Sequence, residues 1–173
     1  MCRIGTYVLF NYDETPQQFF NRLEFSIRLN KRYDVQITSF PMKFVPFKHR
    51  DRSHVSELWN KRWLRGLQCI LLATRGQVSP KPDFFHAAFG QDYHEFAKIV
   101  SMPEHYIIWR EKHRCHEAAD WEKLFMNLTR EQRSKLLDIL IDGRVTKERI
   151  AQIADKKLKS ILEHYINEHE LAK

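Results

Sequence analysis

Residues 4–47 read IGTYVLFNYDETPQQFFNRLEFSIRLNKRYDVQITSFPMKFVPF, with an apolar run near each end of the segment. The first run spans residues 7–10 and the second spans residues 35–40. Both are rich in the β-branched and aromatic side chains that favour strands. The segment between them is long enough for one helix, so the pattern predicts a strand, a crossover helix and a second strand. Such a unit is expected to be parallel and right-handed.

The start of the helix is well marked. Thr15 is a good N-cap residue, and Pro16 follows it at the first helical position, where its missing N–H costs nothing. Gln18 stands three residues after Thr15 and completes a capping box. Apolar residues such as Phe19 and Leu23 then give the helix a broad apolar side.

Two parallel strands alone make an incomplete sheet. Parallel sheets are normally covered on both faces and contain further strands, because a free strand edge exposes unpaired N–H and C=O groups. No third strand of similar quality is predicted downstream, and the first strand begins within a few residues of Met1. The simplest interpretation is the C-terminal part of a larger α/β sheet or barrel. The alternative is a small α+β domain with a two-stranded sheet under helices.

Composition places the chain among globular proteins. With 173 residues, 43% of them hydrophobic, it can bury a core of its own. No apolar run approaches the roughly 20 residues of a membrane span, and the N-terminus lacks a signal-peptide pattern. We therefore expect a cytoplasmic protein that does not insert in a membrane. Cys2, Cys69 and Cys115 are too far apart for a disulfide framework or a Cys-x-x-Cys metal site.

Basic residues concentrate in one window. From Lys43 to Lys81 there are nine Lys or Arg against two acidic residues, an excess equal to the net charge of +7. This window suggests an alternative role in nucleic-acid binding, with Trp59 and Trp63 as stacking surfaces. A solvated surface or packing against an acidic neighbour explains the charge equally well. The candidate phosphate contacts are Lys48, Arg50, Arg52, Lys61, Arg62 and Arg65.

The rest of the chain is predicted to be helical. One helix is expected over residues 55–74 and further short helices follow the Pro-rich linker at 79–82. Asp120 and Thr129 are expected N-caps, and Gly143 is an expected stop. A final helix is predicted from Thr146 to about Ile166, forming a hairpin with its predecessor. The expected organisation is a βαβ unit at 1–47, a basic loop and helical extension at 48–118, and a helical hairpin at 119–173.

No catalytic constellation is apparent. His113, Cys115 and His116 do not share one helix face, so no metal site is predicted. Asp13 and Glu14 precede a helix, where carboxylates are favoured without any catalytic role. The chain also lacks a Gly-rich phosphate loop and a nucleophile elbow. We therefore assign no catalytic residue.

Ligands of parallel α/β sheets and barrels lie beyond the carboxyl ends of the strands. Polar groups and flat or polarisable side chains at those ends would suit an adenine ring or another small aromatic ligand. The alternative is that the aromatic residues and Met42 belong to the core and that Asn11 only caps the turn. The candidate cofactor-binding residues are Asn11, Tyr12, Ser39, Phe40, Pro41 and Met42.

Several segments together resemble the last strand, helix and strand of radical S-adenosylmethionine (SAM) enzymes. The similarity is greatest to the group that can carry a cobalamin-binding domain. It covers roughly residues 4–110, and its motifs are moderately specific as a set. These motifs are YVLFNYDETP at 7–16, FFNRL at 19–23, SFPMKFVP at 39–46, WLRGLQCILLATRG at 63–76 and MPEHYIIWR at 102–110.

The resemblance implies the end of a partial (β/α)6 barrel, followed by an all-helical C-terminal region. Members of this family bind S-adenosylmethionine and a [4Fe-4S] cluster, and the cofactors supply the radical chemistry. The Cys-x3-Cys-x2-Cys motif that holds the cluster is missing here. We therefore expect the chain to be inactive alone, and its expected partner is the missing N-terminal barrel portion, in the same polypeptide or in a separate one.

Overall fold

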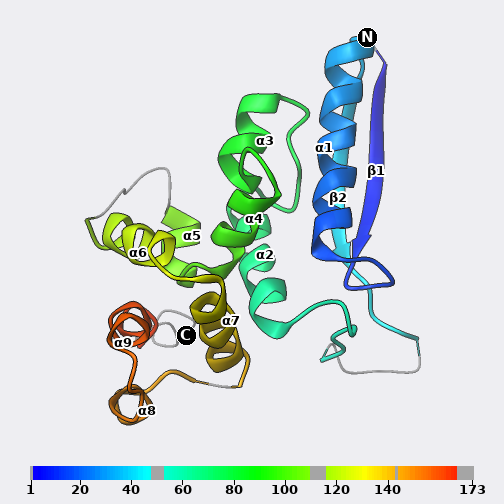
Figure 1. Ribbon diagram of the computed structural model, residues 1–173. Coiled ribbons are helices and arrows are strands. Elements are labelled where there is room, and N and C mark those ends of the chain that lie inside the picture. Colours follow the sequence, from blue (N-terminus) through cyan, green and yellow to red (C-terminus); the bar gives the residue numbers. More distant parts are fainter. Residues whose placement is uncertain (1, 48–52, 110–115, 143, 167–173) are drawn as a thin grey trace. The chain divides into compact units, whose positions relative to one another are not determined.

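The computed structural model describes residues 2–47, 53–109, 116–142 and 144–166 (Figure 1). The chain divides into two compact units, Met1–Val100 and Ser101–Lys173. An N-terminal βαβ unit is followed by helices, as the sequence predicts. The elements in chain order are β1 (Arg3–Phe10), α1 (Pro16–Tyr33), β2 (Gln36–Lys43), α2 (Lys61–Ala73), α3 (Pro82–Phe89), α4 (Tyr93–Ser101), α5 (Glu104–Trp109), α6 (His116–Met126), α7 (Arg130–Ile141), α8 (Lys147–Ala151) and α9 (Lys156–Glu163).

The two strands form a parallel pair. Their register runs from Arg3 opposite Gln36 to Phe10 opposite Lys43, so both strands are longer than the apolar runs suggested. α1 connects them and lies along one face of the sheet (Figure 1). Within the described residues, β1 pairs with no strand other than β2. The predicted capping box is formed, since Thr15 and Gln18 exchange side-chain to backbone hydrogen bonds. The predicted strand–helix–strand unit is confirmed.

Backbone hydrogen bonds show which groups of each strand face the partner. The Gln36 N–H donates to the Cys2 carbonyl at 2.9 Å, and the Phe44 N–H donates to the Phe10 carbonyl at 2.8 Å. Because backbone orientation alternates along a strand, the even-numbered residues of both strands turn their N–H and C=O groups inward. The odd-numbered residues turn theirs outward, away from the partner strand.

Several outward groups of β2 are bonded to other parts of this chain. The Asn30 side chain accepts from the Ile37 N–H at 2.6 Å and donates to the Ile37 carbonyl at 3.0 Å. The Val78 N–H donates to the Ser39 carbonyl at 2.8 Å. Pro41 has no N–H at all and its backbone faces outward, so β2 passes through it to Lys43 without losing a ladder bond, as expected for a proline in an edge strand.

The core of the first unit is aromatic. Phe19 lies between Phe10 and Trp59, with ring centroids 5.7 and 5.8 Å from its own. Phe20 packs against Phe85 of α3 and Phe96 of α4 at 5.8 and 5.4 Å. All of these side chains are buried. The apolar side of α1 therefore joins the sheet to the helices that follow it. Within the described residues, none of the helices is both long and apolar enough to cross a membrane.

Three helix boundaries differ from the sequence prediction. α2 begins at Lys61, not near residue 55, because the Asn60 side chain caps it by accepting from the Trp63 N–H. α6 begins at His116, so Asp120 lies inside the helix and is not its cap. The final predicted helix is divided into α8 and α9, because Asp155 starts a new helix by accepting from the N–H groups of its first turn. The stop at Gly143 lies outside the described residues.

The second unit packs its helices around Tyr165. This side chain is buried, and its hydroxyl donates to the Ser101 carbonyl at 2.7 Å while accepting from the Trp121 indole N–H at 3.1 Å. Tyr106 and His164 also share a hydrogen bond of 2.9 Å. Thr129 is the N-cap of α7, as predicted, and forms a capping box with Gln132. The region 119–173 thus contains more helices than the predicted hairpin.

Gly66 gives a test of close helix packing in the first unit. A Cβ atom there would lie 2.2 Å from the Val100 carbonyl oxygen, which is a backbone atom that cannot rotate away. We expect Gly66→Ala to lower the free energy of unfolding by ~1–3 kcal/mol, although alanine has the better helix propensity. Urea denaturation followed by circular dichroism measures this change. Gly5→Ala is the matched control, since its Cβ would meet only the Phe40 ring at 3.4 Å; equal stability of the two variants would contradict the prediction.

Candidate functional site

The carboxyl ends of β1 and β2 are where the sequence predicts a ligand. β1 leads into a tight turn at Asn11, whose φ of 64° is left-handed, a conformation that asparagine tolerates better than most residues. The chain then passes through Tyr12 and Asp13 to Glu14 and enters α1 at its Thr15 cap. β2 ends at Lys43, beside Phe10. The predicted residues at both strand ends are therefore close to one another.

Asn11 is used to hold three pieces of backbone together. Its side chain is fully buried, and its amide nitrogen donates to the Phe44 carbonyl at 3.2 Å and to the His54 carbonyl at 3.0 Å. Its amide oxygen accepts from the Ser56 N–H at 2.9 Å. Both amide hydrogens are thus engaged by the protein. These bonds join distant segments and do not cap the turn itself, and a ligand contact by Asn11 stays a prediction.

The four predicted residues of β2 are split between the two faces of the sheet. Ser39 and Pro41 are buried on the α1 side, and the Ser39 hydroxyl lies 3.2 Å from that of Thr6. Phe40 and Met42 point to the opposite side, because side chains alternate along a strand. Met42 is 48% exposed there. The structure thus brings Phe40 and Met42 to one surface but not Ser39 or Pro41.

The sheet face opposite α1, here called the outer face, is apolar toward the carboxyl ends of the strands. Tyr7 and Leu9 from β1 lie there beside Phe40 and Met42 from β2, while the other half of this face carries Arg3, Gly5, Gln36 and Thr38. Tyr7 is 77% exposed and its ring centroid is 6.0 Å from that of Phe40. The predicted residue Tyr12 is also exposed and packs against Phe44, with centroids 4.6 Å apart. Aromatic and thioether groups at the strand ends are therefore available to a ligand or to another protein.

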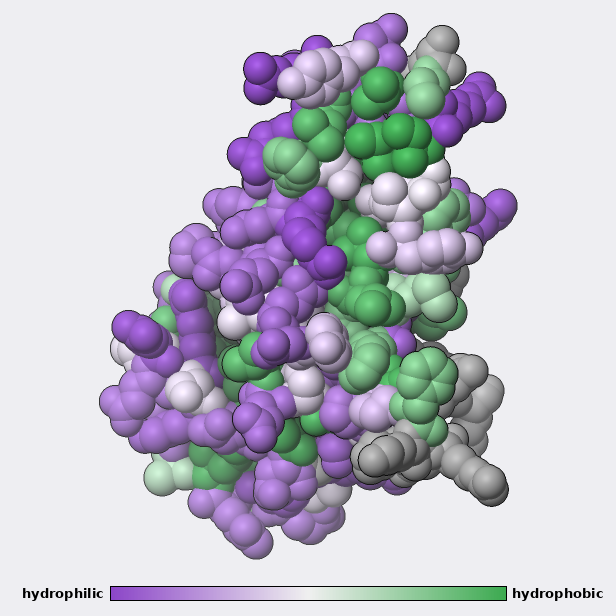
Figure 2. Space-filling model, turned by 90° about the vertical axis from the view of Figure 1, so that its right-hand side faces the viewer, coloured by the Kyte–Doolittle hydropathy of each residue, from purple (hydrophilic) through white to green (hydrophobic). Residues whose placement is uncertain are grey.

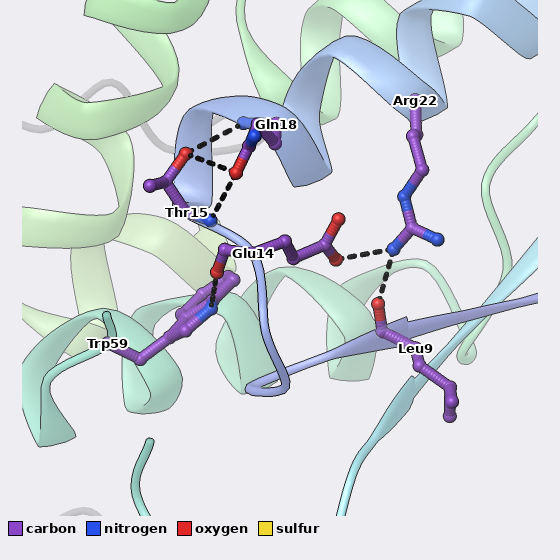
Figure 3. A network of polar contacts seen from close by, with 6 residues as sticks. All are labelled: Leu9, Glu14, Thr15, Gln18, Arg22 and Trp59. Carbon is purple, nitrogen blue, oxygen red and sulfur yellow. Dashed lines mark hydrogen bonds and ion pairs between the residues drawn. The ribbon is translucent and has the colours of Figure 1, made fainter. Parts of the chain in front are cut away.

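An ion pair that the sequence did not reveal lies beside the turn. The Arg22 guanidinium from α1 donates both to a Glu14 carboxylate oxygen and to the Leu9 carbonyl (Figure 3). The Glu14 backbone carbonyl accepts from the Trp59 indole N–H at 2.9 Å. From the sequence, Glu14 was interpreted only as a favourable charge before a helix. Arg22 stands eight residues further on, a spacing without a recognised side-chain pairing pattern, so no local signal linked the two.

The basic candidates do not form one surface within the described residues. Lys48, Arg50 and Arg52 lie outside the described part of the chain. Lys61 is exposed at the start of α2, Arg65 is half-buried and Arg62 is buried. Trp59 is buried as well and packs against Phe10 and Phe19, so it does not present a face to a base. Nucleic-acid binding by these residues stays a prediction.

The described residues do not provide the set of donor atoms that a [4Fe-4S] cluster needs. Cys2 is exposed at the start of the sheet and Cys69 is buried in α2, while Cys115 lies outside the described residues. Among the residues that the structure describes, no three His, Cys, Asp or Glu side chains are grouped to hold a metal ion. The residues that are described therefore do not fit a [4Fe-4S] cluster.

Glu14 provides a pH-dependent test of whether burial outweighs the ion pair with Arg22. Burial raises the pKa of its carboxyl group above the usual 4.5, and the Arg22 charge and hydrogen bond offset this only in part. A raised folded-state pKa favours folding at low pH, and this contribution is lost as the pH rises through that pKa. Relative to Glu14→Gln, the natural chain should thus lose stability as the pH rises from about 4 to 7. Urea denaturation across this pH range measures the difference in stability between the natural chain and Glu14→Gln. A difference that does not change with pH would contradict a raised pKa of Glu14.

Comparison with known proteins yields no relative of this chain. No protein-family model, curated protein or solved structure matches it.

Proposed function

We propose that this chain is the C-terminal portion of a radical SAM enzyme and forms one wall of the site for S-adenosylmethionine or substrate. The observation that carries the proposal is the outer face with Tyr7, Leu9, Phe40 and Met42. A parallel sheet is normally buried on both faces, and here α1 covers only one of them. In a partial barrel, the face opposite the helices is the interior.

The barrel reading also explains the chemistry of this face. Interior residues near the carboxyl ends of barrel strands contact the ligand in enzymes of this architecture. Phe40, Met42 and Tyr12 provide flat or polarisable surfaces there, which suit the adenine ring of S-adenosylmethionine. Asn11 and Ser39 serve in this arrangement as structural residues, since their polar groups already bond to the protein.

The cluster itself must come from elsewhere. The described residues lack a suitable donor set, and the sequence lacks the three-cysteine loop. The chain therefore contributes shape, apolar contacts and shielding from water, and another polypeptide or segment contributes the cluster ligands. No step of the radical reaction is assigned to a residue of this chain.

Co-expression tests the proposal directly. We expect the chain to co-purify with a polypeptide from the same genome that carries a Cys-x3-Cys-x2-Cys loop and the preceding β/α units. The complex should retain S-adenosylmethionine in equilibrium dialysis, and residues 1–173 alone should not. Met42→Ala should weaken retention by about tenfold, since it removes a buried apolar contact worth roughly 1–2 kcal/mol.

Leu72→Ala is the matched control for this experiment. Leu72 is an exposed leucine on α2 and belongs to neither strand, and its replacement should leave retention unchanged. If no such polypeptide co-purifies, or if the complex binds S-adenosylmethionine equally well with and without Met42, the proposed function is wrong.

A further inference from the structure

β1 and β2 differ in whether their outward backbone N–H and C=O groups have hydrogen-bond partners. On β2, Ile37 bonds to Asn30, Ser39 bonds to Val78 and Pro41 has no N–H to satisfy. On β1, the outward groups belong to Arg3, Gly5, Tyr7 and Leu9, here called the open edge. Within the described residues, no backbone pairs with Arg3, Gly5 or Tyr7 on that side. A row of unpaired donors and acceptors is a template for another strand.

Arg22 sets one end of this template. Its guanidinium occupies the outward Leu9 carbonyl and is held in place by Glu14 (Figure 3). A strand added to β1 can therefore use the groups of Arg3, Gly5 and Tyr7 but not the Leu9 carbonyl. The available length corresponds to about five residues of extended chain. This ion pair therefore limits the register of an incoming strand at the carboxyl end of β1.

Exposed apolar side chains lie beside the open edge on both faces of the sheet, together with Arg3 and Thr6. Tyr7 and Leu9 are exposed on the outer face, and Ile4 is 43% exposed on the α1 face. Because Arg22 reaches β1 from α1, residues three and seven positions later lie on the same side of the helix. These are Phe25, which is 54% exposed, and the partly exposed Leu29. Figure 2, drawn from the β1 side, shows hydrophobic surface running along this part of the molecule.

We propose that the open edge binds a strand of a partner polypeptide, and that this strand is apolar on both faces. The inference rests on the proposed function for the partner's identity, but the chemistry follows from the edge itself. Backbone groups of Arg3, Gly5 and Tyr7 supply the hydrogen bonds. Ile4 and Phe25 on one side and Tyr7 and Leu9 on the other supply the apolar contacts. A continuous apolar run fits such a site, whereas an alternating polar and apolar strand fits only one face.

The probes are two labelled synthetic peptides, KKVIVIVKK and KKVSVSVKK, added to the full chain. Fluorescence anisotropy measures binding, and amide hydrogen exchange followed by NMR locates it. We expect tighter binding of the continuous apolar peptide. It should slow exchange at Gly5 and Tyr7, which face outward, and leave Thr6 and Val8 unchanged because they already face β2.

Variants separate the backbone contribution from that of the side chain. Tyr7→Pro removes an outward N–H without touching the β1–β2 ladder, and it should weaken binding of KKVIVIVKK by about tenfold or more. Tyr7→Ala retains the N–H and should bind better than the proline variant. Phe25→Ala should weaken binding, while Leu72→Ala on α2 should not. Circular dichroism confirms that each variant is folded.

Three results would overturn the inference. Equal binding of the two peptides would show that the edge does not select an apolar strand. Protection at β2 residues in place of Gly5 and Tyr7 would place the strand elsewhere. A dimer in size-exclusion chromatography that Tyr7→Pro dissociates would show that a second copy takes the edge. Peptide binding without any cluster-carrying partner in co-expression would support this inference while the proposed function fails, so the two outcomes are distinguishable.

Discussion

Parallel pairing of β1 with β2 is the constraint on which the first unit depends. A parallel pair needs a crossover connection, and α1 provides it. A capping box fixes where this helix begins, and its apolar side is buried. That apolar side then fixes the aromatic core, because Phe19 and Phe20 reach the residues around Trp59, Phe85 and Phe96. The same pairing leaves one sheet face and one strand edge without cover inside the described chain. The functional proposals follow from this uncovered face and this uncovered edge.

Local signals in the sequence predicted the parts of the fold that local chemistry controls. Thr15 with Gln18 and Thr129 with Gln132 form the expected capping boxes, since both partners lie three residues apart in the sequence. The missed boundaries also have local causes. Asn60 and Asp155 cap helices whose apolar spacing extends beyond the cap, so periodicity alone carried the predicted helices through them.

The candidate site was less predictable because its contacts connect distant segments. The positional rule for strand ends found the right neighbourhood, yet it did not distinguish residues that face a ligand from residues that face α1. Alternation along β2 makes that distinction, and it separates Met42 from Pro41. The bonds of Asn11 to the His54 and Ser56 backbones span more than forty residues, and no spacing pattern reports them. The apolar outer face was visible in the sequence only as two strand-like runs.

The hydrogen bonds and the proline along the outward edge of β2 affect how copies of this protein associate at high concentration. Asn30 and Val78 occupy outward groups of that strand and Pro41 lacks an N–H, so β2 offers a neighbouring strand fewer donors and acceptors than β1 does. A molecule with two open strand edges would add further copies at both edges and form fibres. Because the β2 edge is partly occupied, addition of a strand there is disfavoured relative to addition at β1. One side-chain amide, one backbone N–H and one proline thus work against the formation of longer assemblies.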